Sequence, residues 1–224
     1  DKELMELIEK KVSFSNPPDV SFEYSNLGFA LLGRIITEVS GIPYQQYIKE
    51  NIWQPLGMKT SEWEYGNVTP EKLAHGYRWL NNQWNEETLL HDVPDGSWGA
   101  MGSMITSIDE FSTYMAFHLS AWPPSNATET GPVNRSSVRE MRRPGRWNGF
   151  NAAFTYPVGR SCPVTSAYCY GLGWMKDCDG RTFISHSGGL PGFGSQWRIM
   201  PDYGIGVVAF ANRTYSPFSG VNLR

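Results

Sequence analysis

Two short polar motifs contain the residues best placed to act on a substrate. The first, Tyr24-Ser25-Asn26, lies just before an apolar run, where a turn can hold polar side chains against a cleft while the next helix anchors them. The second, His186-Ser187-Gly188-Gly189, ends an expected strand. Glycines in a strand allow another backbone or a substrate to approach closely and expose backbone N–H groups. A substrate carbonyl could bind to those N–H groups.

Each motif also has a purely structural interpretation. Ser25 or Asn26 can cap the helix that follows, because these residue types accept hydrogen bonds from the first N–H groups of a helix. His186 can be a surface histidine at a strand end that is followed by a glycine turn. Neither motif alone decides between the two interpretations.

Taken together, the motifs resemble a known family. Tyr-x-Asn at 24–26 and His-Ser-Gly at 186–188 are similar to the second and third active-site motifs of the penicillin-recognising serine hydrolases. This superfamily includes class C β-lactamases, DD-peptidases, D-aminopeptidases and family VIII esterases. The long spacing between the motifs carries most of the resemblance. Three other segments also agree with the family, so the resemblance covers nearly the whole chain: 55–58, 102–111 and 201–204.

The resemblance implies a role for each motif residue. Tyr24 is expected to be the general base or proton shuttle, and His186 to stand where relatives have Lys or His. Asn26 is expected to bind the amide of the substrate's acyl side chain, and Ser187 the substrate's carboxylate or polar tail. The backbone N–H of Gly189 is expected to form half of the oxyanion hole, which stabilises charge on the attacked carbonyl. The resemblance implies no cofactor and no metal.

The family's nucleophile is missing from this chain. It is the Ser of a Ser-x-x-Lys motif, which belongs upstream of Tyr-x-Asn and also supplies the other oxyanion N–H. No serine of the 224 residues is followed by Lys three positions later. The start in mid-pattern at Asp1 favours a partial sequence, and a pseudoenzyme is the alternative. In both cases we expect this chain alone to be inactive.

Two functions remain in competition. The leading hypothesis is a serine hydrolase that acts through an acyl-enzyme on an ester, a D-amino-acid peptide or a β-lactam. His186 in place of Lys favours peptidase-like or esterase-like chemistry over an efficient β-lactamase. The alternative is a non-catalytic module that binds a peptide or a cell-wall fragment in the same cleft.

Composition narrows the partners. The chain is 40% hydrophobic and 18% charged with a formal net charge of -3. This is ordinary globular usage, and it lacks the basic surface of a nucleic-acid-binding protein. The longest apolar stretch, residues 27–36, is too short to span a membrane. We expect a small-molecule or peptide substrate, no nucleic acid and no membrane span.

Cysteines and glycosylation sequons favour a periplasmic or secreted location. Cys162, Cys169 and Cys178 lie close together, and their odd number leaves at least one unpaired. The sequence does not decide which two would form a disulfide. Four Asn-x-Ser/Thr sequons are also compatible with secretion, at Asn67, Asn126, Asn134 and Asn212.

Other histidines and tryptophans have simpler interpretations. His75, His91 and His118 lack the spacing of metal ligands, and His118 is expected on a helix surface. Three tryptophans in a polar stretch could line a substrate cleft, although packing against loops is the preferred interpretation: Trp79, Trp84 and Trp98.

Helices are expected first along the chain. An apolar run predicts a buried helix over 26–40 that stops at Gly41, and a second helix over 44–52 that is closed by Pro55 and Gly57. A capping box at 107–110 begins a third helix that runs to about 119. Residues 121–163 are expected to form loops with one short helix at 136–141.

Strands are expected last. Residues 170–176 and 182–187 are expected to form two strands joined by an Asp179-Gly180 hairpin turn. Residues 195–200 and 205–211 are expected to form a second hairpin. The order predicts an α+β fold of the β-lactamase/transpeptidase type, with an antiparallel sheet covered by helices and a mainly helical subdomain. We expect a single partial domain, 1–224, with helices and loops to about 165 and antiparallel strands over 166–224.

Overall fold

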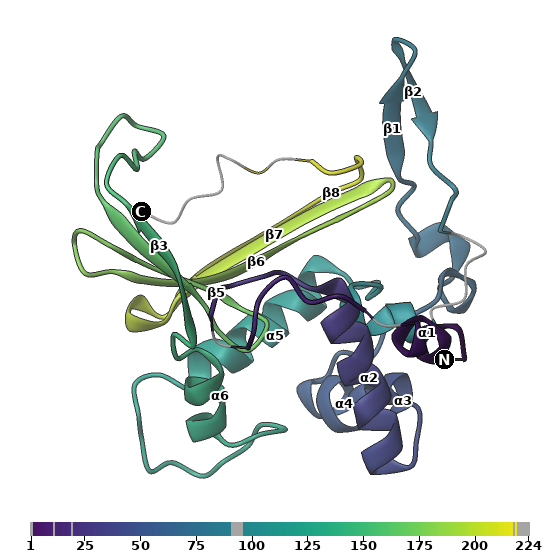
Figure 1. Cartoon of the computed structure of the whole chain (residues 1–224), viewed down its shortest axis with the longest axis horizontal. Helices are drawn as coiled ribbons and strands as arrows, with labels where there is room; N and C mark the ends of the chain where they lie inside the picture. The colour runs from purple at the N-terminus through teal and green to yellow at the C-terminus, as the bar shows by residue number, and fades with distance from the viewer. Residues whose placement is uncertain (1, 11, 19, 91–95, 217, 219–224) are drawn as a thin grey trace. The chain divides into compact units, whose positions relative to one another are not determined.

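The computed structural model describes residues 2–10, 12–18, 20–90, 96–216 and 218. Its internal contacts divide the chain into two compact units. The helical unit consists of Asp1–Leu73 and Leu89–Ser107, and the sheet unit consists of Ala74–Thr88 and Ile108–Arg224. Figure 1 labels the helices and strands of both units.

The helical unit confirms the first two predicted helices and extends the second. Its elements are α1 (Lys2–Glu9), α2 (Asn26–Ser40), α3 (Tyr44–Ile48), η1 (Lys49–Trp53), α4 (Gln54–Leu56), η2 (Tyr65–Asn67), η3 (Pro70–Lys72) and η4 (Gly96–Met101). The helix predicted to end at 52 continues through a π-helical segment, η1, to Leu56. Gly57, with a φ of 80°, then ends it in the left-handed conformation that favours glycine.

Close packing fixes α2 within the helical unit. A Cβ on Gly33 would lie 2.6 Å from the Cβ of Ala100, so only glycine allows α2 to approach η4 this closely. The hydroxyl of Tyr44 donates to the carbonyl of Gly96 at 3.1 Å, which joins α3 to the same segment. The start of α2, with Tyr24 and Ser25 before it, is therefore anchored by its own unit.

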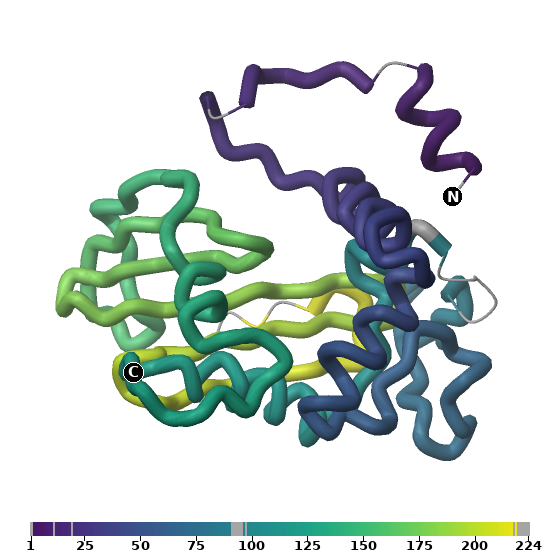
Figure 2. Tube along the Cα trace, turned by 90° about the horizontal axis from the view of Figure 1, so that it is seen from below, coloured from purple at the N-terminus to yellow at the C-terminus, as the bar shows by residue number. Residues whose placement is uncertain are grey.

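The sheet unit contains one large antiparallel sheet. Its strands follow chain order, β3-β4-β5-β6-β7-β8, and lie side by side as a meander (Figure 2). Their bounds are β3 (Arg146–Asn151), β4 (Val164–Tyr168), β5 (Gly173–Asp177), β6 (Thr182–Leu190), β7 (Phe193–Met200) and β8 (Ile205–Ala211). The unit also holds α5 (Ile108–Ser120), α6 (Arg135–Met141), η5 (Pro201–Tyr203) and the separate hairpin of β1 (Tyr77–Leu80) and β2 (Gln83–Glu86). The predicted third helix, short helix and four C-terminal strands are confirmed.

Helix α5 covers one face of this sheet. The ring of Phe111 packs edge-on against Trp197 of β7 and Phe210 of β8, with centroids 5.9 and 5.7 Å apart. Ile184 and Ile199 are directly opposite in the β6–β7 register and are almost fully buried. The predicted helix-covered antiparallel sheet is therefore present.

The prediction of loops over 121–163 was wrong for residues 146–151. They form β3, an edge strand whose register against β4 shifts between Trp147 and Gly149. Such a bulge gives an edge strand a local kink, and the Asn and Gly residues here hid the strand pattern. Strands thus begin before residue 166, whereas the single-domain boundary itself stays a prediction.

The turn between β5 and β6 also differs from the prediction. The N–H of Gly180 donates to the carbonyl of Asp177, so Cys178 and Asp179 are the central turn residues. Gly180 alone has a positive φ, 79°, and Asp179 does not. This is a three-residue loop with a left-handed glycine, and not the two-residue Asp-Gly turn, which needs a positive φ at both positions.

His118 is buried, and the prediction that it lies on the helix surface was wrong. Phe111, Met115 and His118 share the inner side of α5. The imidazole, with no exposed surface, packs against the rings of Tyr114 and Trp197, with centroids 4.6 and 5.9 Å away. Burial, and then the charge of Arg142, lowers the pKa of His118 to about 4.

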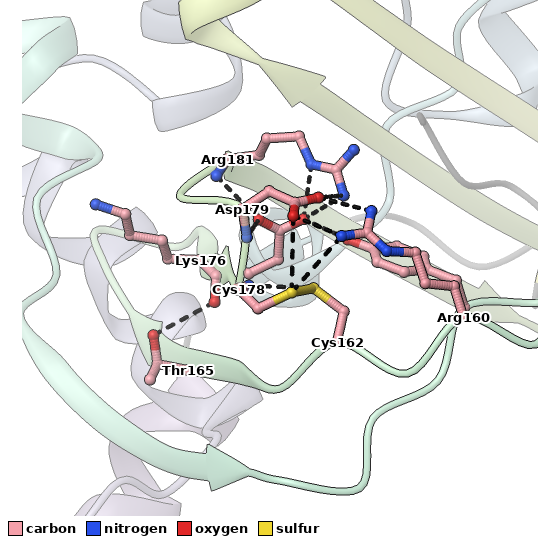
Figure 3. Close-up of a disulfide and its surroundings, with 9 residues drawn as sticks. Arg160, Cys162, Thr165, Lys176, Cys178, Asp179 and Arg181 are labelled. Atoms are coloured by element: carbon pink, nitrogen blue, oxygen red, sulfur yellow. Dashed lines mark hydrogen bonds and ion pairs between the residues drawn. A yellow bond between two sulfur atoms is a disulfide. The ribbon is translucent and has the colours of Figure 1, made fainter.

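A disulfide joins Cys162, just before β4, to Cys178 in the β5–β6 loop (Figure 3). Cys169 is not disulfide-bonded. Beside the disulfide, the buried carboxylate of Asp177 accepts hydrogen bonds from Tyr156 and Arg181, both at 2.7 Å. Burial opposes ionisation of Asp177, but these hydrogen bonds outweigh it and hold the pKa of the carboxyl below its usual value.

Candidate active site

The first motif lies at the start of α2. Ser25 is the N-cap, with φ -138° and ψ 103°, and its hydroxyl accepts a hydrogen bond from the N–H of Gly28 at 2.9 Å. The capping interpretation is therefore confirmed for Ser25. Asn26 is the first residue of the helix, and the side chain of Tyr24, just before the cap, is about half exposed. The cap fixes the backbone from which both side chains project.

The second motif lies in β6, where His186 is held by two hydrogen bonds. Its Nδ1 lies 2.7 Å from the carbonyl oxygen of Ser187, and its Nε2 lies 3.3 Å from the hydroxyl of Tyr168. A carbonyl only accepts, so Nδ1 carries a proton. In the neutral ring Nε2 then accepts a hydrogen bond from the Tyr168 hydroxyl.

The backbone around this motif has a neighbour on only one side. Strand β5 pairs with β6 from Thr182 to Ser185 and ends there, opposite Gly173. Residues 186–190 pair with β7, and no described strand flanks them on the side that β5 covers farther along. A strand edge of this kind can pair with an extended substrate backbone.

A groove of about 340 Å³ runs along the same segment. Its lining is mostly small and polar: Ser187, Gly188, Gly189, Ser195, Gln196, Tyr215, Ser216 and Phe218. A Cβ on Gly189 would lie 2.3 Å from Cδ1 of Tyr215, so the Tyr215 ring occupies the space that any other residue would need. Packing therefore requires a glycine at 189, independently of any role of its N–H.

Sequence reasoning missed two residues that shape this site. Tyr168 contacts His186 from β4, and Tyr215 covers Gly189 from the segment after β8. Neither belongs to a local motif, because Tyr168 reaches the site through the pairing of β4, β5 and β6, and Tyr215 reaches it from the segment that follows β8. A tyrosine at the last position of a strand was the one signal that could have drawn attention to Tyr168.

The predicted site residues divide between the two units. Tyr24 and Asn26 belong to the helical unit, whereas His186, Ser187 and Gly189 belong to the sheet unit. The structure brings the last three together on one strand, and Ser187 and Gly189 share one groove. The roles assigned to all five residues remain predictions.

One cluster among the described residues has donor atoms close enough for a metal ion: Cys162, Cys178 and Asp179. The two sulfurs are joined in the disulfide, and metals bind thiolates, so this donor set does not fit a metal. His75 pairs with Glu86, and His91 lies outside the described residues. The described helices include none that is both long and apolar enough to span a membrane.

Curated relatives match most of this chain but are much longer than it. An unguisins hydrolase from Aspergillus campestris is 28% identical over 206 residues, which is 90% of this chain and 35% of the relative. Protein flp from Staphylococcus aureus is 29% identical over 205 residues, 89% of this chain and 35% of the relative. The chain thus spans about a third of the curated relatives it matches.

Solved structures share the fold. The octameric penicillin-binding protein homologue from Pyrococcus abyssi matches with a TM-score of 0.73 and 24% identity, over 93% of this chain and 43% of that one. The D-amino acid amidase from Ochrobactrum anthropi matches with a TM-score of 0.66 and 21% identity, over 96% and 57%. The β-lactamase/transpeptidase-like fold is confirmed. Because the family model described as Beta-lactamase matches residues 3–224, the chain belongs to the beta-lactamase family.

Proposed function

We propose that this chain is part of a serine hydrolase that acts through an acyl-enzyme on an ester, a D-amino-acid peptide or a β-lactam. The observation that carries the proposal is the segment of β6 beyond the end of β5, where His186, Ser187 and Gly189 lie along one strand edge. Family membership supports it, and so does the hydrolase activity named for one relative. The nucleophile comes from sequence outside these 224 residues.

Proton transfer is assigned to Tyr24 and His186. Tyr24 accepts the proton of the nucleophilic serine and returns it to the leaving group, as a general base and then a general acid. His186, which Tyr168 and the carbonyl of Ser187 hold in one tautomer, assists this transfer. This pair of roles explains why the histidine is held on both of its nitrogens.

The remaining motif residues bind the substrate. Asn26 donates to the amide carbonyl of the acyl side chain, and the exposed hydroxyl of Ser187 donates to the carboxylate or polar tail. The N–H of Gly189 supplies one oxyanion donor, and the N–H of the nucleophilic serine supplies the other. Both oxyanion donors are then backbone groups, so neither needs a particular side chain.

A periplasmic or secreted location is part of the proposal. Disulfides persist in oxidising compartments, and Cys162 and Cys178 form one. All four sequon asparagines are exposed: Asn67, Asn126, Asn134 and Asn212. The fourth, Asn212, uses its amide nitrogen to donate to the carbonyl of His75 at 3.0 Å, so it is a poor acceptor for a glycan.

The test uses the longer protein that contains this chain. It is treated with a fluorescent penicillin and with a fluorophosphonate, and mass spectrometry locates the labelled serine. We expect labelling at a Ser-x-x-Lys serine, at least about tenfold slower in Tyr24→Phe because the general base is lost. Tyr203→Phe, at another exposed tyrosine, is the matched control and should label at the original rate.

A non-catalytic binding module is the second candidate, and the lack of Ser-x-x-Lys in these 224 residues favours it. A longer protein that also lacks this motif and forms no covalent adduct would leave the binding module as the function. Equilibrium binding of a D-alanyl-D-alanine peptide, weakened by Ser187→Ala, would then support it.

A further inference from the structure

Two half-exposed tryptophans face each other on the hairpin of the sheet unit. Trp79 and Trp84 are directly opposite in the β1–β2 register, with ring centroids 5.0 Å apart and an interplanar angle of 68°. They remain 50% and 54% exposed, so packing against loops, the preferred sequence interpretation, leaves about half of each indole uncovered. The guanidinium of Arg213 lies 5.7 Å from the centre of the Trp84 ring and helps to fix it.

The hairpin is tied by backbone hydrogen bonds to the segment after β8. The N–H of Tyr77 donates to the carbonyl of Asn212 at 3.0 Å, and the N–H of Thr214 donates to the carbonyl of Tyr77 at 2.9 Å. The next residue, Tyr215, covers Gly189 in the groove. One short segment therefore contacts both the hairpin and the candidate substrate groove.

The same hairpin also packs on the turn that follows β6. A Cβ on Gly76 would lie 2.7 Å from Cα of Gly192, so the two backbones are in direct contact. Gly192 is further held because its N–H donates to the hydroxyl of Thr214 at 2.7 Å. The base of the hairpin thus contacts Gly192, which is three residues after Gly189 in the chain. Figure 1 shows the tip of β6 and β7 beside the base of the hairpin.

We propose that Trp79 and Trp84 form a subsite for an aromatic or large apolar side chain of the substrate. The identity of this occupant as substrate rests on the proposed function, because the groove with Ser187 and Gly189 is where the polar backbone of the substrate binds. Indole faces and edges stack favourably on aromatic groups. The subsite then selects substrates with such a side chain over those with a small one.

The exposed area favours a substrate over a second copy of the chain. Two half-exposed indoles offer roughly 250 Å² in total, whereas a stable interface buries about 800 Å² on each partner. An area of this size suits one side chain of a ligand. Docking of a second copy would instead give a change that depends on protein concentration.

The first test measures binding and needs no activity. The indole N–H resonances of the 224-residue chain are followed by NMR during titration with N-acetyl-phenylalanine amide, as either enantiomer, and with N-acetyl-alanine amide. We expect saturable shifts of the Trp79 and Trp84 resonances with the phenylalanine compound, at least about fivefold larger than with the alanine compound. Trp147, an exposed tryptophan on β3 that packs edge-on against Trp174, is the internal control and should not shift.

Four outcomes would overturn the subsite. The Trp79 and Trp84 resonances stay unchanged, or they shift equally with both compounds, or they shift no more than Trp147. A shift that depends on protein concentration, with a doubled mass in light scattering, would also overturn it in favour of a contact between two copies. The Trp79→Val/Trp84→Val variant keeps residues that favour strands and should lose the effect while the turn amides of Asn81 and Asn82 keep their shifts.

The second test separates the subsite from the proposed function. In the longer protein, Trp79→Val/Trp84→Val should lower kcat/KM about tenfold for a phenylalanyl ester or amide and less than about twofold for the alanyl analogue. Equal losses for both substrates would overturn the subsite. A longer protein that hydrolyses neither compound, yet shows the indole shifts, would refute the proposed function and leave the subsite in place.

Discussion

At the scale of single residues, the contact between Tyr168 and His186 is the interaction that most directly affects the proposed chemistry. Removing the hydroxyl in Tyr168→Phe takes a hydrogen bond from Nε2 of His186. We expect kcat of the longer protein to fall about tenfold with KM nearly unchanged, because Tyr168 is a positioning residue. Tyr170→Phe, at a tyrosine that is 67% exposed, should have no effect.

A merely structural role for Tyr168 would give a different result. It would lower the free energy of unfolding and leave the pH dependence of kcat unchanged. The positioning role changes that pH profile while the free energy of unfolding, measured in urea, stays within about 0.5 kcal/mol of the original. Identical kinetics for Tyr168→Phe and Tyr170→Phe would contradict the assignment.

The close contact between Gly189 and Tyr215 leads to a second prediction at this scale, about the free energy of unfolding. Gly189→Ala places a methyl group in the space of the Tyr215 ring, and overpacking of this kind costs about 1–3 kcal/mol of unfolding free energy. Tyr215→Ala should relieve most of this cost, so urea unfolding of both single variants and the double variant should show strong coupling. Gly145→Ala, whose new methyl would meet its nearest neighbour at 3.4 Å, is the control and should cost less.

His118 predicts a dependence of stability on pH. The pKa of the folded ring is about 4, below its ordinary value of 6.5, so below pH 6.5 the unfolded chain binds a proton that the folded chain does not. Stability is therefore complete above about pH 6.5 and is lost as the pH falls towards 4, by about 2–3 kcal/mol at pH 4.5. His118→Phe should remove this loss in urea unfolding, whereas His75→Phe, at an exposed ring, should retain it.

At the scale of elements, the Cys162–Cys178 disulfide closes a loop of 16 residues that contains β4 and β5. Cross-linking a loop of this length stabilises a fold by about 3 kcal/mol, mainly by restricting the unfolded chain. The Cys162→Ser/Cys178→Ser variant should lose about that much in urea unfolding. Cys169→Ser should lose much less, and equal losses would show that the disulfide has no special effect.

How well each element was predicted depends on how locally its sequence determines it. The helix over 26–40 was predicted almost to the residue because its apolar run, its cap at Ser25 and its stop at Gly41 are all adjacent in sequence. Strand β3 was missed because its stability comes from pairing with β4 and not from its own residues. The cysteine pairing stayed open for the same reason, since it depends on how β4 and β5 pair.

In the candidate site, too, residues in local motifs were predicted and residues brought in by distant segments were not. The family resemblance singled out Tyr24, Asn26 and His186 as candidates, because each lies in a short segment with a recognisable pattern, and their roles stay predictions. Tyr168 and Tyr215 were not predicted, because only the folded chain brings them to His186 and Gly189. The burial of His118 likewise follows from the face of α5 that the sheet covers.

At the scale of the whole molecule, each unit holds only part of the proposed machinery, and the chain has no Ser-x-x-Lys. Ser25, the serine next to Tyr24, already uses its oxygen to cap α2, and no lysine follows it at the third position to help remove its proton. We therefore expect the 224-residue chain to hydrolyse nitrocefin and p-nitrophenyl acetate no faster than its own Tyr24→Phe/His186→Ala variant. Intact-mass spectrometry after incubation with penicillin should show no adduct.

A covalent adduct on the 224-residue chain would contradict this expectation in an informative way. Its position would identify a nucleophile within the chain, and Ser25→Ala would show whether the capping serine provides it. Loss of the adduct in Ser25→Ala with unchanged helix content would mean that the cap and the nucleophile are the same residue. The hydrogen bond from the Gly28 N–H occupies only one of the two lone pairs of the Ser25 hydroxyl, so the other lone pair could still attack a substrate while a base removes the proton.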